Sequence, residues 1–246
     1  MYDFVSDDGI GHTLWLMDND EDIQGITNAF ARLPHLYVAD GHHRTASAVR
    51  VGTMRREKYP DYKGDEEFNY VMTVIFPDNQ LKIFDYNRVV QDFNGRTQAQ
   101  FMAEVKEKWN VEEVPANASY RPSRLHQVSM YMDGKWYFIS PKAGTWNAQD
   151  EVDNLDVSIL QNNLLQPILG IEDPRRDNRI DFVGGIRGLE ELVRRVDSGR
   201  EVVAFAMYPT SMDELIGIAD AGKIMPPKST WFEPKLRSGL FIHLLQ

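Results

Sequence analysis

Apolar residues recur along the chain in two patterns, which predict a succession of strands and helices. Short runs rich in β-branched and aromatic residues, bounded by Gly, Pro or Asp, are typical of strands. Apolar positions three and four apart are typical of helices that bury one face. These patterns predict strands over residues 12–17, 35–40, 68–76, 81–90, 127–132, 135–139, 180–183, 202–207 and 240–245. They predict helices over residues 18–32, 43–58, 97–109, 157–169, 186–196 and 212–221.

The middle of the chain carries the strongest hairpin signal. Asp133 and Gly134 separate two alternating apolar runs, a combination typical of a tight two-residue turn between antiparallel strands. Residues 77–80 separate two further β-rich runs. Because strands and helices alternate elsewhere, we predict a mixed α/β or α+β chain of at least eight strands, some paired in parallel and some antiparallel.

Composition and charge narrow the classes of function. With 42% hydrophobic and 26% charged residues the chain has the material for a folded core. The formal net charge of -10 repels a nucleic-acid backbone, and the absence of cysteine excludes disulfides, thiolate zinc sites, iron–sulfur clusters and cysteine nucleophiles. No apolar run approaches the ~18 residues of a membrane span, and the first residues lack the features of a signal peptide. We therefore expect a cytoplasmic protein that binds neither nucleic acid nor a membrane.

The most informative stretch is Tyr37-Val-Ala-Asp-Gly-His-His-Arg-Thr45, in which a predicted strand leads through a glycine turn into a predicted helix. Such a junction presents unpaired backbone N–H groups at the positive end of the helix dipole, which suits an anion such as phosphate. Gly41 permits close approach of the backbone. The side chains of Arg44, Thr45 and Ser47 are placed to hydrogen-bond phosphate oxygens.

The same stretch offers groups for catalysis or metal binding. Asp40 ends the predicted strand, where a carboxylate holds a divalent cation or accepts a hydroxyl proton. His42 and His43 are adjacent, so one of them is expected to face the site. A solvated helix cap is the alternative interpretation. A zinc site of Asp40 with both histidines is disfavoured, because adjacent side chains diverge and no spacing typical of zinc ligands is present. The chain also lacks a Walker lysine loop and a Rossmann glycine fingerprint.

Two further loops are rich in charge. Residues 225–239 are dense in Pro, Gly and cations, and Lys228 and Ser229 are candidates for an anionic-ligand site. In the competing interpretation this loop wraps the core, with Trp231 and Phe232 filling it while the charges stay in water. Residues 173–179 are interpreted as solvated surface.

Three segments resemble a known family. They are residues 37–44, residues 155–171 with the motifs Leu155-Asp-Val-Ser-Ile-Leu160 and Gln166-Pro-Ile-Leu-Gly-Ile171, and residues 225–240. In this order they are similar to the prokaryotic family catalogued as domain of unknown function 1015, over essentially the whole chain. Members are usually longer and have a section ahead of the first predicted strand. Because no complete strand is predicted before Gly11, we expect that the chain begins part-way into a domain.

Asp40-Gly-His-His-Arg44 is also similar to the phosphate-binding motif of the ParB/sulfiredoxin-like fold. That fold includes partition proteins that bind CTP, sulfiredoxins that bind ATP, and free serine kinases that carry an Asp-Gly-His-His-Arg motif. The resemblance implies that Gly41, His43 and Arg44 hold nucleotide phosphate and that Asp40 assists a metal ion or a hydroxyl. It implies a nucleotide-binding portion over residues 1–92, N-terminally incomplete, and an α+β portion over residues 93–246. In such folds a further acidic catalytic residue can come from upstream sequence.

Residues and resemblance together predict an ATP- or ADP-dependent phosphotransferase that uses Mg²⁺ and acts on a small hydroxyl compound such as free serine. The alternative is a nucleotide-binding regulatory or adaptor module without turnover. The predicted catalytic residues are Asp40, which is also the metal ligand, His42 and His43. The predicted phosphate-binding residues are Gly41, His43, Arg44, Thr45, Lys228 and Ser229.

Overall fold

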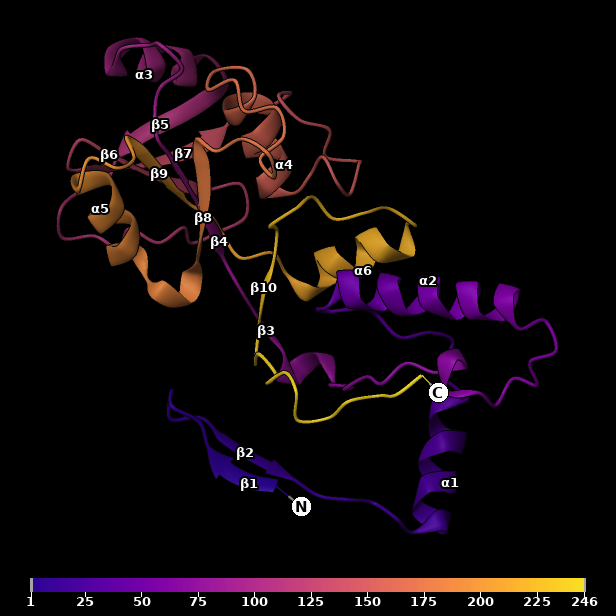
Figure 1. Ribbon diagram of the computed structural model, residues 1–246. Helices are drawn as coiled ribbons and strands as arrows, with labels where there is room; N and C mark the ends of the chain where they lie inside the picture. Colours follow the sequence, from indigo (N-terminus) through magenta and orange to yellow (C-terminus); the bar gives the residue numbers. More distant parts are fainter. Residues whose placement is uncertain (1, 246) are drawn as a thin grey trace. The chain divides into compact units, whose positions relative to one another are not determined.

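The computed structural model describes residues 2–245 of the chain (Figure 1). By its internal contacts the chain divides into two compact units, residues 1–38 and residues 39–246. The division predicted at residue 92 stays a prediction, although strand β4 (Tyr86–Val90), which precedes it, pairs with strands that follow it.

The first unit holds a hairpin and a helix. Strands β1 (Tyr2–Val5) and β2 (Gly11–Leu14) pair antiparallel, and helix α1 (Asp20–Phe30) follows them. The side chain of Asn19 caps α1 by accepting from the backbone N–H groups of Glu21 and Asp22. The helix predicted here is confirmed. The expectation that no complete strand precedes residue 11 is wrong, because β1 finds its hydrogen-bonding partner in β2.

A six-stranded antiparallel sheet organises the second unit. Its strand order is β5-β7-β6-β9-β4-β8. Apart from β4, the strands are β5 (Trp109–Glu113), β6 (Val128–Met132), β7 (Lys135–Pro141), β8 (Ile180–Gly184) and β9 (Val203–Ala206). The predicted Asp133-Gly134 hairpin is confirmed as the β6–β7 pair. Every strand pair described within residues 2–245 is antiparallel, so the expected parallel pairs are wrong while the mixed α/β class holds.

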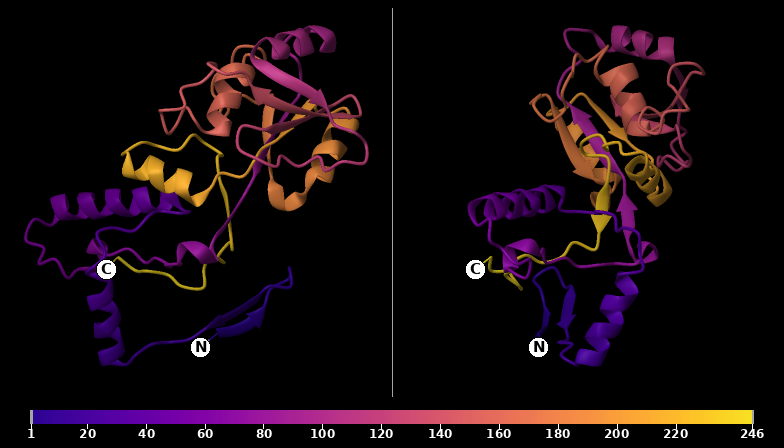
Figure 2. Two further views of the ribbon diagram at one scale, coloured as in Figure 1. Left: turned by 180° about the vertical axis from the view of Figure 1, so that it is seen from behind. Right: turned by 90° about the vertical axis from the view of Figure 1, so that its right-hand side faces the viewer.

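Both faces of this sheet are covered, because successive side chains of a strand point to opposite faces. Val90 of β4 packs with helices α3 (Gln98–Lys108) and α4 (Asp156–Leu160). Its neighbour Val89 packs with helix α5 (Leu189–Asp197) in a separate apolar cluster. The sheet therefore lies between α3 and α4 on one face and α5 on the other (Figure 2).

The elements that carry the site lie beside this core. Helix α2 (His42–Lys58) packs against the short turn η1 (Glu67–Asn69), and helix α6 (Met212–Asp220) starts at a capping box formed by Ser211 and Glu214. Strands β3 (Lys82–Phe84) and β10 (Trp231–Glu233) form a small antiparallel ribbon. The remaining short elements are η2 (Asp78–Gln80), η3 (Gln161–Leu165) and η4 (Gly185–Arg187). None of the described helices combines the length and apolar character that a bilayer-spanning helix requires.

Three predicted strands are not strands. Residues 35–40, 68–76 and 240–245 belong to no sheet among the described residues. Apart from the buried Phe68, most of their apolar side chains are exposed, as Leu36 at 55%, Val74 at 62% and Ile242 at 78% show. The strand-turn-helix element expected at residues 35–58 is accordingly a loop, a turn and a helix. β-rich composition favours an extended chain, but a strand forms only where a neighbour supplies the ladder of hydrogen bonds.

The charged loop at residues 173–179 is only partly solvated surface. Arg175 and Arg176 are exposed and pair with Asp173. Arg179 instead donates to the carbonyl oxygens of Leu169 and Gly170, which follow the helical segment that ends at Leu165. This loop is therefore tied to the fold through one of its three arginines.

A buried acid lies where α4 begins. Asp156 is 7% exposed, and its Oδ1 accepts from the backbone N–H of His126 at 2.9 Å and from Nδ1 of the same residue at 2.8 Å. Its Oδ2 is buried and has no hydrogen-bond partner among the described residues. Burial raises the pKa of Asp156 to about 6, against the opposing effect of the His126 contacts.

This raised pKa predicts a pH-dependent stability. Between about pH 4 and pH 6 the folded chain holds the Asp156 proton more tightly than the unfolded chain, so the Asp156 contribution to the free energy of unfolding falls as pH rises through this window. We expect Asp156→Asn to remove a contribution on the order of 2–3 kcal/mol between pH 4 and pH 7. Urea unfolding of both proteins across this range measures it, and parallel pH profiles would contradict it.

Candidate functional site

The N-terminus of α2 starts from a glycine in the left-handed conformation. Gly41 has φ 83° and ψ 29°, and no side chain caps the helix. The first regular bond of α2 runs from the N–H of Thr45 to the carbonyl oxygen of Gly41, at 2.9 Å. The N–H groups of the residues between them have no partner within the helix, and they point along the positive end of its dipole.

Arg44 lies over this turn. A Cβ atom built on Gly41 would lie 3.0 Å from Nη2 and 3.2 Å from Nε of Arg44, so the guanidinium folds back across the glycine. The Arg44 side chain is exposed and does not enter the core. The turn therefore combines free backbone donors with a guanidinium, which are the groups that bind phosphate oxygens.

Of the other predicted residues of this segment, Asp40, His42 and His43 are exposed around the same turn, and Thr45 is half-buried. Asp40 directly precedes it, and His42 and His43 begin the helix. The carboxylate of Asp40 has one ion-pair partner among the described residues, Lys235, whose Nζ lies 3.4 Å from Oδ2. Within residues 2–245 no three His, Asp or Glu side chains are grouped to hold a metal ion.

A buried arginine holds the 225–239 loop in place. Arg88 of β4 is 4% exposed and donates from Nη2 to the carbonyl oxygen of Lys228 at 3.0 Å, and from Nη1 to the carbonyl oxygen of Tyr86. Burial lowers the pKa of the Arg88 guanidinium to about 10, which leaves it charged at neutral pH. Lys228 adopts a positive φ of 58°, and its Nζ lies 3.4 Å from the Tyr86 hydroxyl.

Ser229 is buried, and its hydroxyl makes a hydrogen bond within the 225–239 loop. It is 5% exposed, its hydroxyl donates to the carbonyl oxygen of Pro226 at 2.6 Å, and its own carbonyl oxygen accepts from Thr210 at 3.2 Å. Phe232 is buried, as the core-wrapping interpretation of the loop requires. The loop therefore has the buried framework of the core-wrapping interpretation together with exposed lysines, and the anion-site roles of Lys228 and Ser229 stay predictions.

Aromatic rings connect the exposed lysines. The Trp231 ring lies against Gly184, so a Cβ atom built on this glycine would be 2.7 Å from the ring. The Trp231 and Tyr86 rings contact each other edge-on, with 5.4 Å between their centres. Nζ of Lys228 lies 5.4 Å from the centre of the Tyr86 ring, and Nζ of Lys235 lies 5.4 Å from the centre of the Trp231 ring. The loop thus reaches Asp40 through Lys235, a residue that sequence reasoning placed only among the loop's cations. The only sequence feature that pointed to Lys235 was its position in a loop dense in Pro and cations.

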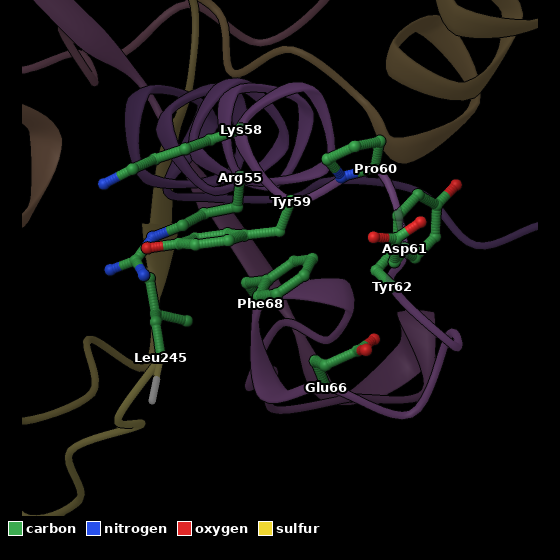
Figure 3. A pocket seen from close by; sticks show the side chains of 9 residues that line it. All are labelled: Arg55, Lys58, Tyr59, Pro60, Asp61, Tyr62, Glu66, Phe68 and Leu245. Carbon is green, nitrogen blue, oxygen red and sulfur yellow. The ribbon is translucent and has the colours of Figure 1, made fainter.

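A separate hollow of about 570 Å³ lies at the other end of α2 (Figure 3). Tyr59, Tyr62 and Phe68 supply its aromatic wall, and the pKa of the Tyr59 phenol is lowered by the neighbouring ammonium of Lys58. None of the predicted site residues lines it. Because a helix of 17 residues is about 25 Å long, this hollow is distinct from the α2 N-terminus.

Comparison with known families identifies the chain. The model of a family described as "Protein of unknown function (DUF1015)" matches residues 1–158. The chain belongs to this family. The resemblance to this family seen in the sequence is thereby confirmed over residues 1–158, whereas the similarity to the ParB/sulfiredoxin-like fold stays a prediction. A search of curated proteins found no match.

A search of solved structures found several chains that are similar to this one at low sequence identity. A free serine kinase variant in complex with AMP has 14% identity and a TM-score of 0.41, over 88% of this chain and 81% of the kinase chain. A free serine kinase variant in complex with ADP has 15% identity and a TM-score of 0.39, again over 88% of this chain and 81% of the kinase chain. A conserved hypothetical protein from Pyrococcus furiosus has 14% identity and a TM-score of 0.44, over 87% and 81%.

The packing of Trp231 on Gly184 predicts that a substitution at Gly184 loosens the 225–239 loop. Gly184→Ala places a methyl group 2.7 Å from the ring, so Trp231 has to move, at a cost of about 1–3 kcal/mol. We expect faster tryptic cleavage within residues 225–239. Gly217→Ala is the matched control, because nothing lies within 4 Å of its added Cβ. Equal cleavage of the two variants would show that Trp231 does not hold the loop.

Proposed function

We propose that the α2 N-terminus binds the phosphates of ATP or ADP and that the protein transfers a phosphoryl group to a small hydroxyl compound such as free serine. The observation that carries the proposal is the uncapped, glycine-initiated first turn of α2 covered by the Arg44 guanidinium. A non-catalytic nucleotide-binding module is the second candidate, because it needs the same anion site without turnover.

Helix α5 provides an internal comparison. It also begins after a glycine, Gly188, and has no side-chain hydrogen bond at its cap. There, however, a Cβ atom on the glycine would lie 2.3 Å from a carboxylate oxygen of Glu190, so the chain's own anion covers the turn. At α2 a cation covers the corresponding glycine, and the first turn contains no acidic residue. This end of α2 gathers positive charge that an external anion would balance.

Asp40 supplies the negative group beside this positive turn. In phosphoryl-transfer sites Mg²⁺ is held by one or two carboxylates together with the phosphates themselves, so a single exposed Asp40 fits such an ion. When bound, Mg²⁺ neutralises charge on the phosphates. Under the proposal Gly41, His43, Arg44 and Thr45 position the phosphates, and His42 lies beside them.

The transfer exchanges one bond to phosphorus for another. The hydroxyl oxygen of the acceptor bonds to the terminal phosphorus, and the bond from that phosphorus to its bridging oxygen breaks. The hydroxyl proton passes to the Asp40 carboxylate. The leaving group is ADP when ATP is the donor and AMP when ADP is the donor.

Arg44 provides the test of binding. We expect Arg44→Ala to weaken ADP and ATP binding by roughly 1.5–3 kcal/mol, the scale of a charge-assisted hydrogen bond. Arg50→Ala is the matched control, because it removes an exposed arginine of the same helix beyond the first turn. Titration calorimetry compares the variants with the parent chain. Equal affinity in all three would remove Arg44 from the site.

Nucleotide consumption separates catalysis from binding alone. We expect ATP or ADP to be consumed faster with serine than without it, with phosphoserine as product, and Asp40→Asn to reduce this turnover at least tenfold because its amide cannot accept the proton. Phosphorus NMR follows nucleotide and product together. Tight binding with no serine-dependent consumption would instead favour the regulatory module.

A further inference from the structure

Lys235 is held beside Asp40 by its own loop. The Glu233 carboxylate accepts from the indole Nε1 of Trp231 at 2.7 Å and from the backbone N–H of Lys235 at 2.9 Å. The Trp231 ring is in turn fixed against Gly184. The backbone of Lys235 is therefore tied to the ribbon of β3 and β10, while its side chain extends towards the α2 N-terminus.

The ammonium of Lys235 has two neighbours. Nζ lies 3.4 Å from Oδ2 of Asp40 and 5.4 Å from the centre of the Trp231 ring. The side chains of Lys235 and Asp40 are 43% and 54% exposed. An exposed ion pair of this kind adds little stability, so exchanging one partner for another costs little.

We propose that Lys235 binds ligand in the α2 anion site, with its ammonium paired to Asp40 while the site is free and contacting a phosphate oxygen of the bound nucleotide. The inference rests on the proposed function and names a cation from a distant part of the chain as part of its site. Asp40 alone repels an incoming phosphate, and a neighbouring ammonium offsets this repulsion. The flexible stem of lysine lets the same charge serve both partners.

A double-mutant cycle tests the exchange, with ADP as the probe and divalent cations removed by chelation. We expect Lys235→Met to weaken ADP binding about tenfold, as loss of one charge-assisted contact does. Lys235→Arg is expected to recover most of the affinity. Lys82→Met is the matched control, because Lys82 is an exposed lysine of the same ribbon whose Nζ lies 4.8 Å from the centre of the Phe84 ring.

Asp40→Asn supplies the other side of the cycle. In the parent chain it removes a repelling charge and also frees Lys235, so we expect metal-free ADP binding to strengthen about fivefold. In the Lys235→Met background only the repulsion is removed, and a smaller gain is expected. The difference between the two gains measures the coupling of Asp40 and Lys235 through the ligand.

The outcomes separate this inference from the function on which it rests. If Arg44→Ala loses ADP while Lys235→Met behaves like Lys82→Met, the phosphate site stands and the role of Lys235 is refuted. Equal gains from Asp40→Asn in both backgrounds would refute the exchange as well. Failure of the parent chain to bind ADP would overturn both proposals. Unchanged thermal unfolding of each variant shows that the differences arise at the site.

Discussion

The buried guanidinium of Arg88 connects the sheet to the loop that approaches the site. It donates to the carbonyl oxygens of Tyr86 and Lys228, so the 225–239 loop is fixed to strand β4, which lies between β9 and β8 in the sheet. A buried charge is costly unless hydrogen bonds satisfy it, and these two carbonyls offset that cost. Because the loop starts from this fixed point, Trp231 meets Gly184 and Lys235 meets Asp40. The geometry beside α2 therefore depends on an arginine inside the sheet.

The helices and the hairpin of the core were predictable because their signals are local. The turn at Asp133 and Gly134 has positive φ at both residues, 51° and 73°, as the Asp-Gly signal indicates. Thr97 and Gln100 form the capping box that opens α3, close to the start that periodicity predicted. In each case the residues that determine the element are a few positions apart, so the sequence alone displays them.

The strand predictions failed where pairing had to come from elsewhere. Residues 68–76 have the β-branched and aromatic composition of a strand, yet Val71 and Val74 are exposed because no neighbouring ladder joins them. The candidate site likewise has one part that the sequence indicates and one part that it does not. The turn of Gly41 and Arg44 was evident in the sequence, whereas Lys235 pairs with Asp40 from 195 positions away. Nothing in the spacing of the residues indicates such a contact.

Overall charge and local charge act in opposite directions on an anionic ligand. The formal net charge of -10 repels a nucleotide at long range, but salt screens such a field beyond about 8–10 Å. Closer than this, a nucleotide bound as proposed would meet the α2 amides, Arg44 and Lys235, with Asp40 as the acidic group that pairs with Lys235. Under the proposed function, binding is therefore decided by groups within one helical turn and by one loop side chain.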